Sequence, residues 1–361
     1  MTRLQAGLAA AVGLLGLLGL VLPLSAETGL LDTPFLTTFA VLCAASLFRF
    51  RNPLPVSVDG CLTLAAGLAL PMSLTVIDRG SAGFWCLAAA GWLAAWLFVE
   101  RLTASRRGGR WTALAVPVLF GVTLLVLWEV VTRGLNVPQV LLPPPSAIGA
   151  RFAASIPILW ADFQQTFLKA VLIGYALGCG SAFLVAIAID RSPFLQRGLL
   201  PVGNLISALP IIGIAPIMVM WFGFDWPSKA AVVIVMTFFP MLVNTVAGLA
   251  EAGRMERDLM RTYAAGYWQT LVKLRLPAAA PFIFNALKIN STLALIGAIV
   301  AEFFGTPIVG MGFRISTEVG RMNVDMVWAE IAVAAVAGSA FFGAVALVER
   351  AVTFWHPSNR T

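Results

Sequence analysis

Long runs of apolar residues recur along this chain and constrain its fold more than any other feature. A helix that crosses a bilayer needs about 20 mostly apolar residues. By that criterion the sequence contains about ten candidate spans, of which the second and fourth are short. They are residues 5–25, 34–48, 60–77, 84–99, 112–132, 166–189, 198–222, 229–250, 281–304 and 326–348. We therefore predict an all-α polytopic membrane protein with about ten transmembrane helices.

The composition excludes an ordinary soluble fold. Of the 361 residues, 60% are hydrophobic and 11% are charged, whereas soluble domains carry roughly 25% charged residues. Lipid must solvate much of this apolar surface, so the net charge of +7 does not indicate a nucleic-acid partner. One histidine and four scattered cysteines argue against a metal site and against a Ser-His-Asp or Cys-His constellation. We expect no catalytic residue and no metal ligand in this chain.

The distribution of Lys and Arg predicts the orientation. With the N-terminus in the cytoplasm and ten alternating spans, most of the 24 basic residues fall on the cytoplasmic side, as the positive-inside rule requires. The C-terminus then also lies in the cytoplasm. The first apolar run could instead be a signal peptide, because Arg3 precedes an apolar core that ends at Ala26. Its length favours a span.

A polar break suggests two modules. Residues 100–111 (ERLTASRRGGRW) are the most polar break of the first half and are typical of a linker. We predict an N-terminal four-helix membrane extension over residues 1–105 and a second domain over residues 106–361. Few polar residues occur in the first four spans, for which we favour a scaffold or assembly role.

A charged segment, residues 251–281, lies between two spans on the predicted cytoplasmic side. It is too charged to cross lipid and is long enough for a short helix, a turn and a second helix. No proline occurs between Asp258 and Lys273. We expect Pro277 and Pro281 to stop the helical pattern before the next span.

One face of this segment is predicted to be apolar. Leu259, Tyr263 and Ala264 have the spacing of residues that share a helical face. A short amphipathic helix in a cytoplasmic loop either lies on the membrane surface or docks into a groove on a partner. The periodicity alone leaves both alternatives open.

An ordered pattern runs through the segment. Asp258, Leu259 and Met260 are followed, at fixed spacing, by Ala264, Leu274 and the pair Leu276 and Pro277. This pattern resembles the coupling loop of ABC importer permeases, which reads Glu-Ala-Ala, three residues, Gly, nine residues, Ile, one residue, Leu-Pro. The acidic residue, the spacing and the Leu-Pro pair agree. The two alanines and the glycine are replaced, and Gly266 lies two residues after the glycine position.

The flanking segments resemble the same family. VLLPPPSAI at 140–148 is similar to the Leu-Pro-x-Pro start of these permease domains. LPIIGIAPIMVMWFGF and FFPMLVNTVAGL resemble the two spans before the loop, and EFFGTPIVGMGF at 302–313 resembles the stretch after it. The likeness covers about 112–354. It is closest to the branch that imports sulfonates, taurine, nitrate, bicarbonate and thiamine-type pyrimidines.

The resemblance implies that the last six spans form a type I ABC importer permease domain in the bacterial inner membrane. It implies an ABC ATP-binding subunit, a periplasmic or lipid-anchored solute-binding protein and a second permease, expected to be an identical copy. The chain contains no G-x-x-x-x-G-K-[ST] motif, so we expect ATP and Mg on the partner subunit and no cofactor in this chain. The implied solute is small and polar or anionic, of the sulfonate, nitrate or pyrimidine-precursor type.

The same resemblance implies a set of residues that couple this chain to the ATPase. Tyr263, Trp268 and Leu271 are apolar enough to pack firmly on a partner, and Asp258, Arg261 and Lys273 could fix register at the rim. The expected coupling residues are Asp258, Leu259, Arg261, Tyr263, Ala264, Gly266, Trp268, Leu274, Leu276 and Pro277.

Polar residues within the spans are candidates for the translocation pathway, because polar side chains at bilayer depth are costly. The alternative is hydrogen bonding between helices, which is ordinary in membrane bundles. The candidates are Asn204, Asn244, Asn290, Ser291, Thr292 and Glu302. The alternative function is an ion-gradient-driven secondary transporter. It would favour midspan carboxylates and inverted halves, and we find neither in the sequence.

Overall fold

The computed structural model describes residues 2–25, 33–47, 55–77, 79–104, 110–192, 194–195, 197–199, 201, 210–305 and 308–355. Within these residues the regular secondary structure is entirely helical, as the apolar runs predict. Eight helices are long and apolar enough to cross a membrane. Two shorter apolar helices, α2 (Pro34–Ala45) and α10 (Ile211–Phe222), lie within two further predicted spans. The all-α membrane fold is confirmed, and the count of ten spans stays a prediction.

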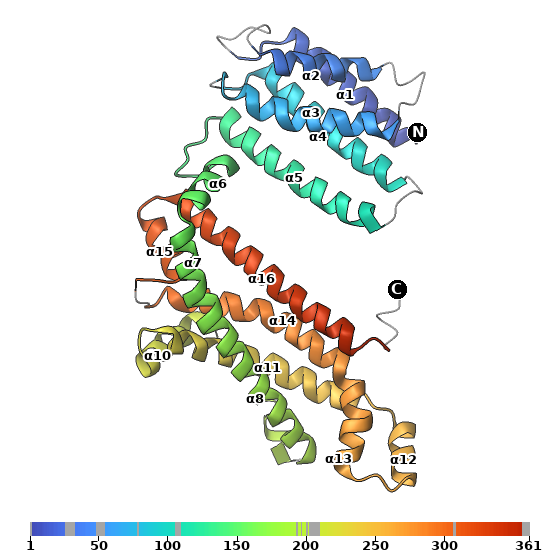
Figure 1. Cartoon of the computed structure of the whole chain (residues 1–361), viewed down its shortest axis with the longest axis vertical. Coiled ribbons are helices and arrows are strands. Elements are labelled where there is room, and N and C mark those ends of the chain that lie inside the picture. Colours follow the sequence, from blue (N-terminus) through green and yellow to red (C-terminus); the bar gives the residue numbers. More distant parts are fainter. Residues whose placement is uncertain are drawn as a thin grey trace. The chain divides into compact units, whose positions relative to one another are not determined.

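The first compact unit comprises residues 1–150 (Figure 1). It contains α1 (Arg3–Val21), α2, α3 (Val56–Ser73), α4 (Ala82–Ala104) and α5 (Arg110–Gly134). α1 contacts α2 and α4, and α3 contacts α2, α4 and α5. Small residues allow close approach, since a Cβ on Gly16 would lie 2.6 Å from Cβ of Cys43. The predicted domain boundary at 105/106 stays a prediction.

One ion pair between two helices and one carboxylate at a helix start stabilise this unit. Asp59, in the first turn of α3, pairs with Arg101 in the last turn of α4, and both side chains are largely buried. Glu129 of α5 pairs with Arg133 at 3.2 Å and accepts from the backbone N–H of Ser146 at 2.9 Å. Because a carboxylate at a helix N-terminus satisfies free N–H groups, Glu129 anchors the start of α6 (Pro145–Ala154).

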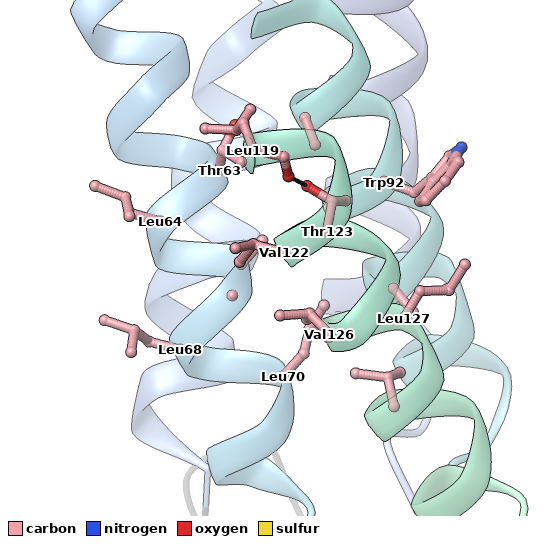
Figure 2. A pocket seen from close by; sticks show the side chains of 16 residues that line it. Thr63, Leu64, Leu68, Leu70, Trp92, Leu119, Val122, Thr123, Val126 and Leu127 are labelled. Atoms are coloured by element: carbon pink, nitrogen blue, oxygen red, sulfur yellow. Dashed lines mark hydrogen bonds between the residues drawn. The ribbon is translucent and has the colours of Figure 1, made fainter. Parts of the chain in front are cut away.

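An apolar cavity of about 220 Å³ lies between α3, α4 and α5 (Figure 2). Leucine and valine side chains dominate its wall. The hydroxyls of Thr63 and Thr123 already donate within their own helices, to the carbonyls of Asp59 at 2.8 Å and Leu119 at 2.7 Å. The cavity therefore suits apolar groups and not a polar solute.

The second compact unit comprises residues 151–361. α7 (Ile156–Phe163), the π-helical segment η3 (Gln164–Val171) and α8 (Leu172–Arg191) form one continuous helix (Figure 1). α11 (Trp226–Ala250) and α14 (Leu276–Glu302) contact each other, and both contact α8 and α10. α15 (Met311–Gly320) and α16 (Val324–Val352) pack against α14. The chain between α11 and α14 forms α12 (Arg254–Thr262), α13 (Tyr267–Thr270) and the π-helical η4 (Leu271–Arg275).

Two glycines bring α8 against α11. A Cβ on Gly174 would lie 2.8 Å from the carbonyl oxygen of Ala230, and one on Gly178 would lie 3.0 Å from the backbone of Ile234. In lipid, association of helices depends on such close packing because no aqueous hydrophobic effect drives it. The small-residue pair therefore sets the distance between these two helices.

Candidate functional site

The predicted short helix, turn and second helix are present between α11 and α14, as α12, a turn at residues 263–266, and α13. The expectation that Pro277 and Pro281 stop the helical pattern is wrong, because a continuous helix runs from Tyr267 to Glu302. Pro277 lies in the first turn of α14, directly after η4. Proline has no N–H to lose, and it is tolerated where a helical hydrogen-bond pattern begins or changes.

α12 ends in a Schellman motif built on Ala264. The N–H of Ala264 donates to the carbonyl of Arg261 at 2.9 Å, and the N–H of Ala265 donates to the carbonyl of Met260 at 3.0 Å. Ala264 has φ of 52°, the left-handed region that favours glycine. The glycine of the coupling-loop pattern therefore has a physical reason at this position, and this chain pays a strain cost for alanine there.

Apolar side chains of this segment face solvent. Leu259 is 55% exposed, Tyr263 is 77% exposed and Trp268 is 58% exposed. The expectation that Tyr263 and Ala264 continue the helical face of Leu259 is wrong, because α12 ends at Thr262 and the chain turns. The three apolar side chains thus come from α12, the turn and α13.

The other predicted coupling residues have different surroundings. Asp258 and Arg261 form an exposed ion pair at 3.3 Å, a type that contributes at most about 1 kcal/mol. The N–H of Gly266 donates to Oε1 of Gln269 at 3.1 Å, and this hydrogen bond caps the start of α13. The expectation that Leu271 packs on a partner is wrong, because its side chain is buried against Leu249 and Ala279. Leu274 and Leu276 are half-buried where η4 meets α14. The coupling role of all ten residues stays a prediction.

Two further residues of this region escaped the sequence analysis. Asp190, near the end of α8, and Arg275, the last residue of η4, form a bidentate ion pair at 2.6 and 2.5 Å. In the sequence Asp190 is one charge at the polar end of a span, and Arg275 is one of several basic residues in a charged loop. No local pattern relates two residues so far apart, so only the packing of α8 against the segment identifies the pair.

A second polar group, the carboxylate cluster (Asp162, Thr166, Glu302 and Arg314), lies at the other end of α14. Thr166, in η3, donates to Oε1 of Glu302 at 2.7 Å, and Asp162 accepts from Nε of Arg314 at 2.9 Å. The pKa of Arg314 lies above its ordinary value: burial acts to lower it, but the hydrogen-bonded Asp162 carboxylate more than offsets that effect. π-helical segments often occur at functional sites.

The Gly-x-Gly turn after α14 is shaped to reach this cluster. The N–H of Gly310 donates to Asp162 at 2.6 Å, and the N–H of Gly312 donates to Oε2 of Glu302 at 2.6 Å. Gly310 has φ of 147°, and a Cβ on Gly312 would collide with the carbonyl of Ile299. The sequence motif of Glu followed by Gly-x-Gly therefore forms one hydrogen-bonded unit.

The predicted pathway residues are distributed over different surroundings. Asn290 is buried and its Nδ2 donates to the carbonyl of Thr237 at 2.7 Å and to Sγ of Cys179 at 3.2 Å, which links α14 to α11 and α8. Ser291 is buried, whereas Thr292 is exposed, and each donates to a carbonyl of its own helix.

The remaining pathway candidates are Asn244, Glu302 and Asn204. Asn244 is half-buried and donates to the carbonyl of Pro240 at 2.8 Å. Glu302 belongs to the carboxylate cluster, and Asn204 lies outside the described residues. The assignment of these six residues to a pathway stays a prediction. Within the described parts of the chain, no group of three or more His, Cys, Asp or Glu is placed to hold a metal ion.

The sequence is similar to one described protein family and to several known transport permeases. Residues 174–354 match the model of the family described as binding-protein-dependent transport system inner membrane component. The chain is 31% identical, over 66% of its length and 95% of the relative's, to the formylaminopyrimidine transport permease protein ThiX of Halalkalibacterium halodurans. It is 30% identical to the riboflavin transport system permease protein RibX of Chloroflexus aurantiacus, over 69% of this chain and 92% of the relative. It is 27% identical to the putative aliphatic sulfonates transport permease protein SsuC of Bacillus subtilis, over 72% and 93% respectively.

Proposed function

Since this chain belongs to the family of binding-protein-dependent transport inner membrane components, the permeases of type I ABC importers, we propose that it imports a small solute with energy from ATP hydrolysed by a separate ABC subunit. The observation that carries this proposal is the α12–α13 segment. It leaves the membrane-spanning bundle, presents exposed apolar side chains that include Leu259, Tyr263 and Trp268, and returns directly into α14.

The exposed apolar side chains fit a docking surface. Leu259, Tyr263 and Trp268 are each more than half exposed, and aromatic side chains that fill a partner's pocket typically dominate a protein interface. The charged residues Asp258 and Arg261 lie beside them and would set the register at the rim. The partner we propose is the ABC ATP-binding subunit, which holds ATP and Mg.

α14 provides a route from this surface to the opposite end of the bundle. It spans 27 residues, about 40 Å of helix, from η4 to Glu302 in the carboxylate cluster. When ATP closes the partner dimer, the docked segment moves, and α14 with α11 and α8 rocks between outward and inward access. The close contact of α8 with α11 at Gly174 and Gly178 supports a common movement of these two helices.

The other partners follow from the same proposal. A periplasmic or lipid-anchored solute-binding protein delivers the solute, and a second copy of this chain completes the pathway. The chain spans the bacterial inner membrane with both termini in the cytoplasm, and it binds no nucleic acid. Relatives named for formylaminopyrimidine and aliphatic sulfonates support a small polar or anionic solute of the sulfonate, nitrate or pyrimidine-precursor type.

Association with the ATPase tests the proposal. The chain is coexpressed with its ATP-binding subunit, and copurification is compared between the wild type, Leu259→Ser and Trp268→Ser. Loss of one buried apolar anchor costs about 1–2 kcal/mol, roughly tenfold in affinity. Ile308→Ser is the matched control, because Ile308 is 79% exposed and follows the opposite end of α14. Undiminished association of a chain that lacks residues 258–273 would contradict the docking role.

A further inference from the structure

Three segments that are distant in the sequence meet beneath the exposed surface of α12 and α13. They are the end of α8, the end of α11 and η4. Asp190, Arg275 and Tyr267, with the carbonyl of Leu249, form a group that we call the junction. None of these residues belongs to the coupling-loop pattern, and the side chains of Asp190, Tyr267 and Arg275 are half-buried, whereas Leu259 and Trp268 are exposed.

The guanidinium group of Arg275 donates four hydrogen bonds at the junction. Nη1 and Nη2 donate to the two oxygens of Asp190 at 2.6 and 2.5 Å. Nε and Nη2 also donate to the carbonyl of Leu249 at 3.1 and 2.9 Å. Asp190 accepts a third hydrogen bond from the hydroxyl of Tyr267 at 3.0 Å. One arginine therefore ties α8, α11 and the α13–η4 segment together in a planar, directional arrangement.

The position of Asp190 at the end of a helix indicates that its negative charge is stabilised by Arg275. It lies one residue before the end of α8, where the helix dipole disfavours an anion. Both side chains of the pair are only 14% exposed, so water screens their attraction far less than that of the exposed Asp258–Arg261 pair, at 69% and 82%.

The local helix geometry directs Arg275 to this partner. η4 hydrogen-bonds in the π pattern, and the N–H of Leu276 donates to the carbonyl of Leu271. A π segment adds one residue to the helix, which turns every following side chain by about 100°. Arg191 reinforces the contact, since its guanidinium lies 4.9 Å from the ring centre of Tyr267 and 5.7 Å from that of Trp268.

We propose that the Asp190–Arg275 pair is a positioning pair that makes the transmembrane bundle follow the docked segment, and this rests on the proposed function above. Without the pair, the segment remains connected to α14 through η4 and keeps its apolar contact with Leu249 and its contact with Arg191, but it loses the charged, directional link between Arg275 and α8. The ATPase then still docks on α12 and α13, while its closure is passed to α14 alone and moves α8 and α11 less. Loss of Asp190 should therefore separate docking from transmission.

The experiment uses the full chain with its ATP-binding subunit in lipid nanodiscs, and ATP with vanadate as the probe. A fluorophore on Ile308→Cys, in a background without other cysteines, reports movement beyond the far end of α14. In Asp190→Asn we expect unchanged copurification and ATP hydrolysis, and a fluorescence response at least about fivefold smaller, the lower range of allosteric coupling. Asp325→Asn is the matched control, because it removes the same charge from an ion pair, Arg151–Asp325, that lies outside the docking segment.

Each outcome decides one question. A full response in Asp190→Asn overturns the proposal, and so does a loss of ATPase association, because the pair would then serve docking or folding. If the Asp190→Asn chain does not fold, Tyr267→Phe and Asp190→Glu are compared, and a wild-type response in both overturns the proposal. Partial recovery in Asp190→Glu supports it. A wild-type chain that binds no ATPase contradicts the proposed function and not the role of the pair.

Discussion

Glu302 offers the sharpest test of how the carboxylate cluster stabilises the second unit. Its side chain is 2% exposed and accepts from the hydroxyl of Thr166 and the N–H of Gly312. In Glu302→Ala both donors lose this buried acceptor. Each buried donor without a partner costs about 1–3 kcal/mol, and the threonine hydroxyl can turn to a carbonyl of its own helix. We therefore expect a loss of about 2–4 kcal/mol in the free energy of unfolding.

Glu302→Gln separates hydrogen bonding from charge. The amide oxygen can accept from Gly312, and the amide NH₂ can donate to Oγ1 of Thr166, which already accepts from the N–H of Met311 at 2.8 Å and has a second lone pair. Because the network can be rebuilt in this way, we expect a loss below about 1 kcal/mol.

Thermal unfolding of the purified chain in detergent, followed by tryptophan fluorescence, measures the difference. One kcal/mol corresponds to about 2–4 °C in Tm for a domain of this size. Glu302→Ala should therefore lower Tm by about 4–16 °C, and Glu302→Gln by a few degrees at most. If both variants unfold at the same lowered temperature, the negative charge is what matters, through groups such as the buried Lys229, and the hydrogen-bond explanation is wrong.

Three other predictions concern the packing and ends of helices. Ala264→Gly removes the cost of the left-handed backbone and should stabilise the end of α12 by about 0.5–1 kcal/mol, seen as slower amide exchange over residues 254–266; unchanged or faster exchange would refute the strain. Gly178→Leu should lower Tm because its Cβ meets the backbone of α11, whereas Gly180→Leu, with nothing within 4 Å, should not. Asp59→Ala leaves the largely buried Arg101 without this carboxylate and should cost about 3–5 kcal/mol, with stability partly regained in Asp59→Leu/Arg101→Leu; an unchanged Tm in Asp59→Ala would contradict this.

The site was only partly predictable from the sequence. The 251–281 segment is recognisable because charge interrupts an apolar pattern and because Leu276 and Pro277 stand at the right spacing after Asp258. The continuation of the helix through Pro281 was not predicted, because proline compatibility depends on which hydrogen bonds the helix needs at that position. The end of α12 at Thr262 was also missed, because nothing in the local composition marks Ala264 as left-handed.

Apolar run length determined by itself that this chain is an all-α membrane protein, since lipid offers no partner for an unpaired backbone and a span must be a helix of about 20 residues. The sequence also contains the spacing that identifies the permease family. Only the tertiary structure decided which polar groups meet. Asp190 and Arg275 pair at 2.5 Å and Thr166 reaches Glu302 at 2.7 Å. A hydrogen bond forms only when donor and acceptor atoms are in contact, so it depends on helix packing and register. No local sequence pattern records these.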